Sequence, residues 1–442
     1  AQRGLVALDL ATGAILPWEA PNVVQNGRND GTFYSGRAGI LSLAADNDTI
    51  YGTGWVYANT ETGNLEGTFA AEPGSGDIRW IADCHGDTLS VYSDGSNVYT
   101  TSHNHDCQTL GGFPQAEPRP GNLRHSQVMT ADVRGTLFRS PHVGRIYLDW
   151  SGWPAPAMQN WFPDWTTGTF TGDGQAGWTV NGSGDYVVVG GEFPYVNGQL
   201  QQGLVRFARE SVAPNSEGPR LSGDRWTTMS AISVEPGTVR VSIAENWDRD
   251  DLSLTYERRR EGVSGPLATL TQDSTFWDRD GVSFTDTGLT PGSTQSYRIV
   301  ARDDDGNAAN SNWVSVVVSD TTATYPKTVL DDGATLYWRL GGPASTAANA
   351  MVAGNSGVPG VGIGSATGAI TGDTDEASDF SGSADSYIAS ERAVVAGAVY
   401  SASSSYSFEF WLRTTTSRGG KVMGYHLYQS GLGGRGYDRQ VY

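Results

Sequence analysis

Charged residues are scarce in this chain of 442 residues, and those present are mostly acidic. They make up 17% of the chain, against a usual share of about 25%. Lysine and arginine number 29 against 48 aspartates and glutamates, so the formal net charge is −19. The basic run Arg258-Arg259-Arg260 falls in a strand-like segment, where side chains alternate between faces and form no patch. Nucleic-acid binding needs a basic surface, so we expect no nucleic-acid partner.

Long apolar runs are missing as well. No stretch reaches the roughly 18 apolar residues that a membrane-spanning helix needs, so we expect no membrane insertion in this piece. A signal peptide is not recognisable, because Ala1-Gln2-Arg3-Gly4 leads directly into a strand. We therefore expect a fragment of something longer at both ends.

Helical periodicity is also lacking, and the nearest candidate for a helix is the short segment Ala347–Val352. The chain instead has 58 glycines, and aromatic residues make up 10% of it. Many turns and many aromatics with few helix formers predict an all-β fold.

Motifs of enzyme active sites are absent too. The sequence has no Gly-x-Ser-x-Gly elbow, no His-Glu-x-x-His and no phosphate-binding glycine loop. Acidic pairs are plentiful, but a chain with 48 carboxylates contains some by composition alone. We predict that this piece is not an enzyme.

The sequence changes character near residues 215 and 325. Before the first change, residues 4–18, 67–80 and 128–138 share one pattern of strand, tight turn with glycine, and strand. Two further strands lie between copies. Four strands per unit, at a period of some 60 residues, are typical of propeller blades.

Three segments carry a resemblance to a known family: Tyr186–Gly198, Asp83–Asp87 and Gly111–Gln115. They resemble the quinoprotein-like repeats (delta-60 or PQQ-type) of large secreted bacterial surface proteins. The resemblance implies a partial β-propeller of about three and a half blades in residues 1–210. It does not imply a quinone cofactor, because non-enzymes share this scaffold.

After a linker at 211–224, residues 225–320 resemble a fibronectin type III domain. Leu289–Tyr297 matches the turn and tyrosine corner of that family. The resemblance implies an immunoglobulin-like sandwich in which the Tyr297 hydroxyl bonds back to the backbone. It also implies a buried tryptophan on the second strand, and Trp247 falls at or just past the end of that strand.

After a short linker at 321–325, residues 326–442 resemble the start of a laminin-G-like, concanavalin A-type jelly roll. Leu336–Leu340 is similar to its opening strand and Tyr406–Leu412 to its central strand. The resemblance implies a jelly roll that is incomplete at the C-terminus, with unpaired edges in this piece.

The two cysteines, Cys84 and Cys107, are expected to form a disulfide in an exported protein, worth about 3 kcal/mol; a reactive or metal-bound thiol is the alternative. His103 and His105 would face one side of a strand, and His85 lies near them in this region. These three are a candidate transition-metal site. The alternative is that they hold blade loops by hydrogen bonds.

Aromatic side chains crowd residues 150–170. The candidate sugar-stacking platform consists of Trp150, Trp153, Trp161 and Trp165. The alternative is that they fill the space between blades or cover a blade edge.

Acidic residues cluster in three loops that a fibronectin type III fold would bring to one pole. The candidate calcium ligands are Asp248, Asp250, Asp251, Asp278, Asp280, Asp303 and Asp305. Carboxylates this close repel, and calcium takes six to eight oxygen ligands with flexible geometry. The alternative is that the loops are solvated or pair with Arg249, Arg279 and Arg302.

The order of modules leads to one functional expectation. We expect a secreted or cell-surface, non-catalytic protein that binds glycan or another surface polymer, with recognition in the loops of the β scaffolds. One alternative is an ancillary part of an extracellular carbohydrate-active enzyme. Another is a structural component of a fibre or phage tail.

Overall fold

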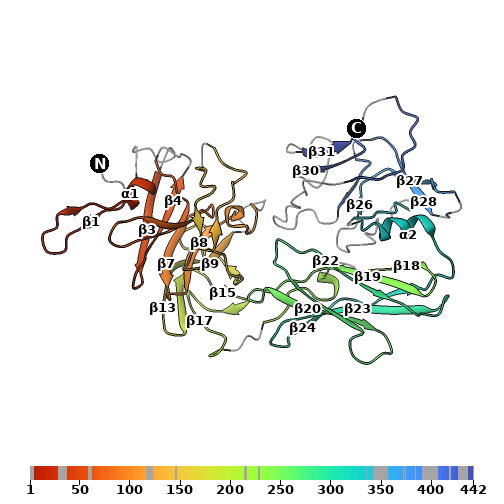
Figure 1. Ribbon diagram of the computed structural model, residues 1–442, viewed down its shortest axis with the longest axis horizontal. Helices are drawn as coiled ribbons and strands as arrows, with labels where there is room; N and C mark the ends of the chain where they lie inside the picture. Colours follow the sequence, from red (N-terminus) through yellow and green to blue (C-terminus); the bar gives the residue numbers. More distant parts are fainter. Residues whose placement is uncertain are drawn as a thin grey trace. The chain divides into compact units, whose positions relative to one another are not determined.

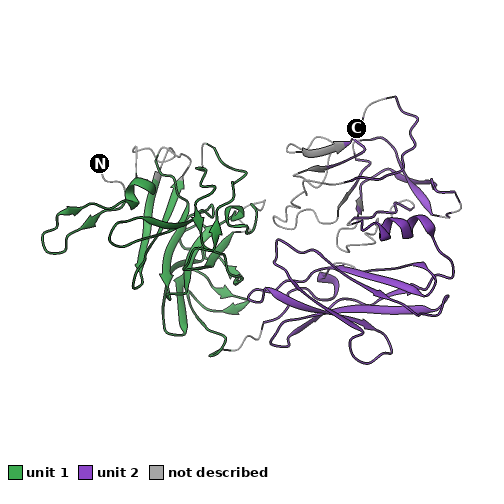
Figure 2. Ribbon diagram, in the orientation of Figure 1, with its two compact units in different colours: residues 1–215, 396–398 green, residues 216–395, 399–442 purple. Residues whose placement is uncertain are grey.

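The computed structural model describes most of the chain. The described residues are 4–27, 37–57, 62–115, 123–144, 147–213, 217–226, 229–334, 336–341, 357–371, 373, 375–383, 385–390, 407–417, 420–426 and 437–441. They divide near residue 215 into two compact units (Figure 2). Nearly all regular structure is β, which confirms the prediction of an all-β chain. Neither α-helix among these residues has the length and apolar character that crossing a membrane requires.

The first unit contains three antiparallel meanders that follow one another along the chain (Figure 1). The first has β3 (Arg37–Ala45), β4 (Ile50–Tyr57), β5 (Gly67–Ala71) and β6 (Ile78–Ala82). The second has β7 (Thr88–Ser93), β8 (Asn97–Asn104) and β9 (Arg124–Thr130). The third has β13 (Gly177–Ser183), β14 (Tyr186–Gly191) and β17 (Leu204–Ala208). Strand β7 contacts both β3 and β13, so the first strands of successive sheets lie side by side.

Short strands complete the first unit. They are β1 (Ala7–Leu8), β2 (Ile15–Leu16), β10 (Gly135–Thr136), β11 (Pro154–Ala155), β12 (Trp165–Thr166), β15 (Tyr195–Val196) and β16 (Gln199–Leu200), with the short helix α1 (Ala20–Val23). Pairs β1–β2 and β10–β11 stand alone, and β12, β15 and β16 form one small sheet.

The predicted repeat is only partly regular. Its first two copies are hairpins with the same turn, and Gly13 and Gly76 take the same position at φ +71° and +79°. Each of these glycines donates its N–H to the carbonyl four residues earlier. The third copy is not a hairpin, because β10 pairs with β11 and not with β9. The prediction at residues 128–138 is therefore wrong: Ala131 bonds to Ser96, and the chain leaves the sheet there.

The second unit begins with a two-sheet sandwich. One sheet has β18 (Ser230–Glu235), β19 (Thr238–Ala244) and β22 (Gly281–Asp286). The other has β21 (Ala268–Asp273), β20 (Ser253–Arg260), β23 (Thr294–Arg302) and β24 (Ala308–Asn310), and β25 (Val314–Val317) also pairs with β23. Alternate residues of β19 point into the core, where Val239, Val241 and Ile243 are fully buried. This strand order is that of a fibronectin type III-like domain, so this prediction is confirmed.

Two details of the sandwich differ from the prediction. The buried tryptophan is Trp226, which is 2% exposed and donates its indole N–H to the Ala244 carbonyl at 2.8 Å. Trp247 is only half-buried and packs against Phe276. The Tyr297 hydroxyl donates to the Asp286 carboxylate and not to the backbone, because this acceptor lies beside it in the core.

A helix, α2 (Thr324–Asp331), follows the sandwich and overlaps the predicted linker at 321–325. Its Leu330 packs against Ile232 and Val234 of β18. Pro326 lies in its first turn, where a missing backbone N–H costs nothing.

Beyond α2, the described strands form two-stranded pairs. These are β26 (Gly357–Pro359) with β29 (Ile388–Ser390), β27 (Ile363–Thr367) with β28 (Glu376–Phe380), and β30 (Met423–His426) with β31 (Tyr437–Val441).

Two predicted strands in this region are not formed as regular strands. Leu336–Leu340 has only a β-bridge at Trp338, and Leu340 takes φ +54°, which interrupts an extended run. Residues 407–412 of the segment Tyr406–Leu412 also lack strand pairing and leave Trp411 and Leu412 exposed. Tyr406 and the predicted helix Ala347–Val352 lie outside the described residues.

Candidate metal centre and ligand pocket

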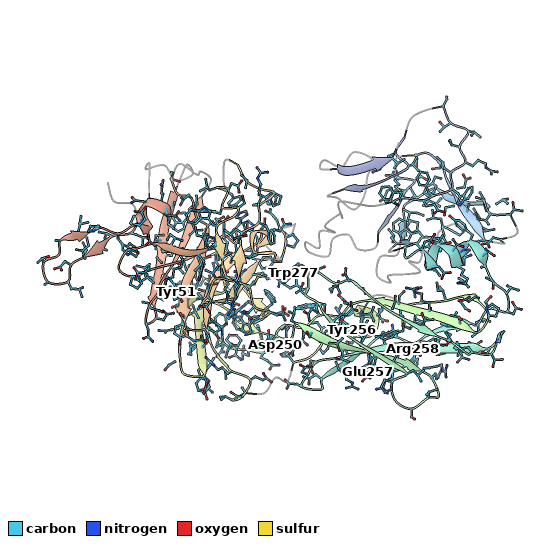
Figure 3. All side chains as sticks on the ribbon, in the orientation of Figure 1. Tyr51, Asp250, Tyr256, Glu257, Arg258 and Trp277 are labelled. Atoms are coloured by element: carbon cyan, nitrogen blue, oxygen red, sulfur yellow. A yellow bond between two sulfur atoms is a disulfide. The ribbon has the colours of Figure 1, made fainter. Side chains whose placement is uncertain are left out.

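Three acidic side chains converge at one end of the sandwich. Asp248 and Asp251 lie in the loop between β19 and β20, and Asp303 lies in the turn between β23 and β24. One carboxylate oxygen from each lies within 4.8 Å of those of the other two. Asp248 is fully buried, Asp303 is buried and Asp251 is half-buried. Figure 3 places Asp250, from the same loop, at this end of the sandwich.

The loops are held in place by their own hydrogen bonds. The backbone carbonyl of Asn246 accepts a hydrogen bond from the Tyr256 hydroxyl. The side-chain amide of Asn246 exchanges two hydrogen bonds with the backbone of Leu221 and so anchors the loop. The Asp303 carboxylate accepts both the backbone and side-chain N–H groups of Asn307 at 2.7 Å. These bonds hold the start of the loop between β19 and β20 and the carboxylate of Asp303.

Burial and neighbouring carboxylates disfavour the ionised form of Asp248. Burial, reinforced by the neighbouring carboxylates of Asp250 and Asp251, raises the pKa of Asp248 to about 7. The guanidinium of Arg249 bonds to Glu217, and that of Arg302 bonds to Glu257. Three carboxylates in one coordination sphere suit a hard cation such as Ca²⁺.

The structure brings together three of the seven predicted calcium ligands. Asp250 acts on Asp248 through a hydrogen bond and its charge. The backbone of Asp280 bonds to Glu245 and that of Asp278 to Thr275, while Asp305 is exposed. Within the described residues, Asp248, Asp251 and Asp303 are the one group of three acidic, histidine or cysteine side chains that converge so closely.

The predicted disulfide is present in the first unit. Cys84 and Cys107 are bonded, with their Cα atoms 4.3 Å apart. Between their flanking residues, His85 is completely buried: its Nε2 lies 3.3 Å from Asp83 and its Nδ1 lies 3.5 Å from Asp106. The ring stacks on Tyr147 at 3.6 Å between centroids.

This buried histidine is held in its charged form. Burial by itself lowers the pKa of His85, but the carboxylates of Asp106 and Asp83 outweigh it and raise the pKa to about 9. Burial, with the charge of Asp87, raises the pKa of Glu66 nearby to about 8. The His85 imidazolium thus offsets part of a buried acidic cluster.

The three predicted metal-binding histidines do not share one centre. His103 Nε2 lies 3.7 Å from Asp87 and its other nitrogen meets the Gln175 amide. The His105 ring lies 6.3 Å from the His85 ring, centroid to centroid. The contacts are those of ion pairs and hydrogen bonds that hold loops between strands.

The four predicted platform tryptophans split into two clusters. Trp150, 4% exposed, packs with Trp153 and donates its indole N–H to the Asn64 carbonyl. Trp161 and Trp165 lie elsewhere, and both pack edge-on against Phe207. The four therefore do not form one surface.

Trp165 does line a pocket. The cavity has a volume of about 190 Å³, and its lining includes Arg124, His125, Ser126, Phe162, Asp164 and Trp165. The Trp165 indole N–H donates to the Ser126 hydroxyl at 2.9 Å. The sequence singled out Trp165 but not Arg124 or Asp164, because residues some 40 positions apart carry no local signal that they lie close together.

The pocket has one charge of each sign. Burial lowers the pKa of Arg124 to about 10, against the opposing effect of Asp164, so the guanidinium stays charged at neutral pH. Burial lowers the pKa of His125 to about 4, so its imidazole is neutral and Nδ1 can donate to the Ser102 carbonyl, 3.2 Å away. A mainly polar lining with the Trp165 indole beside it suits an uncharged, hydroxyl-rich ligand.

Comparisons with known proteins identify no family. No family model matches the chain, and no curated protein matches it. Among solved structures, the FN5 domain of Drosophila Lar is similar at 16% identity, over 23% of this chain and 98% of that chain, with a TM-score of 0.15. The chicken CNTN1 FN1–FN3 domains are similar at 10% identity, over 53% of this chain and 100% of that chain, with a TM-score of 0.19.

Proposed function

We propose that this chain is a non-catalytic part of an exported or cell-surface modular protein and that its first unit binds a glycan. The observation that carries the proposal is the small polar pocket beside the Trp165 indole, which Arg124 and Asp164 also line. The Cys84–Cys107 disulfide supports export, because such bonds persist in oxidising compartments.

The size of the pocket limits the size of the ligand. Pockets for drug-sized molecules usually measure roughly 300–1,000 Å³, and this one has about 190 Å³. It therefore suits one sugar residue of a chain. The Trp165 indole offers apolar surface to the ring carbons, while Arg124 and Asp164 line the pocket as a donor and an acceptor for hydroxyl groups.

The architecture of the proposed protein follows the module order. In it, the first unit is part of a quinoprotein-like propeller, which the three successive antiparallel meanders support. The fibronectin type III-like sandwich is a spacer. Residues from 326 on belong to a laminin-G or concanavalin A-like domain, which the antiparallel strand pairs support.

Calcium is part of the proposal for the second unit. The convergence of Asp248, Asp251 and Asp303 supports a bound Ca²⁺ that offsets their repulsion and ties two loops together. This role is structural and does not require contact with the glycan.

The experiment is affinity electrophoresis of the full chain through gels that contain soluble polysaccharides. We expect at least one polysaccharide to retard the protein, and Trp165→Phe and Asp164→Asn to weaken the interaction about tenfold, which corresponds to about 1.4 kcal/mol. Trp161→Phe is the matched control, because Trp161 packs on the same Phe207 without being among the residues that line the pocket.

The outcomes separate the alternatives. Retardation of the wild type with equal losses in Trp161→Phe and Trp165→Phe would contradict the pocket. No retardation by any polysaccharide would favour the structural role in a fibre or phage tail. Release of reducing sugar by a longer natural form that contains this chain would favour the ancillary part of a carbohydrate-active enzyme.

A further inference from the structure

Two aromatic side chains of the first unit are turned to solvent beside one carboxylate. Phe170, in the loop before β13, is 94% exposed, and Trp178, on β13, is 36% exposed. The carboxylate of Glu192, directly after β14, accepts hydrogen bonds from the Trp178 indole N–H at 3.3 Å and from the hydroxyl of Thr171, the residue after Phe170, at 2.6 Å.

The backbone explains why Trp178 faces outward. The pairing of β13 with β14 is irregular between Gly177 and Thr179, so Trp178 lies in a β-bulge. Bulges redirect a side chain from its place in the regular alternation. The indole is then fixed at its edge by Glu192, which leaves ring surface open to solvent.

The loop that carries Phe170 is equally well fixed. Two backbone hydrogen bonds close its base: the Gly168 N–H donates to the Gln175 carbonyl, and the Glu192 N–H donates to the Ala176 carbonyl. A Cβ at position 168 would lie 2.0 Å from the Glu192 carbonyl oxygen, so only glycine permits this approach. Backbone N–H of Thr171 also donates to the Glu192 carboxylate at 3.0 Å.

We propose that Trp178 and Phe170 form a second carbohydrate-binding subsite, which stacks on the rings of an uncharged polysaccharide. The proposal rests on the proposed function, because it assumes that the first unit binds glycan. A fully exposed phenylalanine in an ordered loop loses apolar contact unless a ligand covers it. Glu192 is a positioning residue, since its oxygens already hold Trp178 and Thr171.

Charge selects the class of polysaccharide. The chain has a formal net charge of −19, and Glu192 itself lies at the edge of the indole. A polyanion would be repelled from this surface. An uncharged polymer is not, and the flat face of its sugar rings matches an aromatic ring.

The test is affinity electrophoresis of the full chain with hydroxyethylcellulose, laminarin and mannan as uncharged probes and polygalacturonate as the charged probe. We expect retardation by an uncharged probe, and a loss of about fivefold to tenfold in affinity for Trp178→Ala and for Phe170→Ala. Trp313→Ala is the matched control, because Trp313 is an exposed tryptophan of the second unit, at 45%. Thermal melting of each variant checks the fold. We expect no change for Phe170→Ala, because this side chain is 94% exposed, and a small decrease for Trp178→Ala, which loses its bond to Glu192.

The outcomes distinguish this inference from the proposed function. If the wild type binds no probe, both are overturned. If the wild type binds, Trp165→Phe weakens binding, and Trp178→Ala and Phe170→Ala do not, the second subsite alone is overturned. If Trp178→Ala weakens binding and Trp165→Phe does not, the subsite stands and the pocket fails. A preference for polygalacturonate would overturn the uncharged class.

Discussion

Tyr297 donates its hydroxyl to Asp286 at 2.9 Å inside the sandwich, where the prediction had a backbone acceptor. The same carboxylate accepts from Arg258 at 3.1 Å and from Arg260 at 2.8 Å. Figure 3 labels Arg258 on β20, next to Glu257. One aspartate thus joins the tyrosine of β23 to two arginines of the neighbouring strand.

We expect substitution of Asp286 to lower the free energy of unfolding more than substitution of Tyr297. Tyr297→Phe removes one hydrogen bond to a charged group and should lower the free energy of unfolding by about 2 kcal/mol. Asp286→Ala also takes the carboxylate from the buried Arg258 and should cost about 3–5 kcal/mol. Calorimetry of the full chain measures both. Equal effects would contradict the central place of Asp286.

The disulfide should be present in protein from an oxidising compartment. Mass spectrometry with and without reductant should show a difference of about two mass units, one hydrogen per sulfur. The double variant Cys84→Ser with Cys107→Ser should unfold more easily by about 3 kcal/mol, since the loop it closes spans 23 residues. Two thiols that alkylate freely in the unreduced native protein would contradict the bond.

Calcium should raise the melting temperature of the second unit relative to chelator. A ligand that binds only the folded state at a hundred times its Kd stabilises by about 2.7 kcal/mol. Asp248→Asn and Asp303→Asn should remove this effect. Asp305→Asn is the control, because Asp305 is exposed and lies outside the group of three. The same melting temperature in calcium and in chelator would exclude the site.

The first unit should lose stability as the pH rises above neutrality. The pKa of His85 in the fold, about 9, exceeds its ordinary value of 6.5, so its ion pairs contribute fully below pH 6.5 and are lost as the pH rises through 9. The gap between the two values corresponds to about 3 kcal/mol. Ionisation of Glu66, whose pKa is raised to about 8, acts in the same direction.

Melting temperatures between pH 6 and 10 measure this loss. His85→Gln should be less stable at pH 6 and should show a flatter profile. His142→Gln is the control, because His142 Nε2 lies 3.6 Å from the same Asp106 but its side chain is 42% exposed. A profile of His85→Gln that runs parallel to the wild type would contradict the role of the imidazolium.

Trp150 should behave as a core residue and not as a glycan ligand. Trp150→Ala removes a buried side chain and should cost about 3–5 kcal/mol. Phe138→Ala, at a side chain that is 64% exposed, is the comparison and should change stability little. If Trp150→Ala reduces glycan binding and leaves the melting temperature unchanged, the result would contradict a core role and support the predicted sugar-stacking role of Trp150.

Features set by local chemistry could be predicted from the sequence. Alternating apolar residues in Val239–Ile243, with turns at glycine, determined the strands of the sandwich. The pairing of Cys84 with Cys107 followed from their being the two cysteines of the chain. Three loop aspartates were also placed correctly at one pole, because strand order decides which loops meet.

Only the tertiary structure decided which side chains are covered and which partners they meet. Trp150 and Phe170 belong to one aromatic segment, yet the first is buried and the second is exposed, because burial depends on what packs against each from elsewhere. Helix α2 forms where apolar positions meet β18, a contact that the sequence does not encode locally. Hydrogen-bond partners such as Asp286 for Tyr297, and the meeting of Arg124 with Asp164, join residues on different strands and loops. Periodicity fixes the face on which a side chain lies, whereas its neighbour across the core is fixed by the packing of whole sheets.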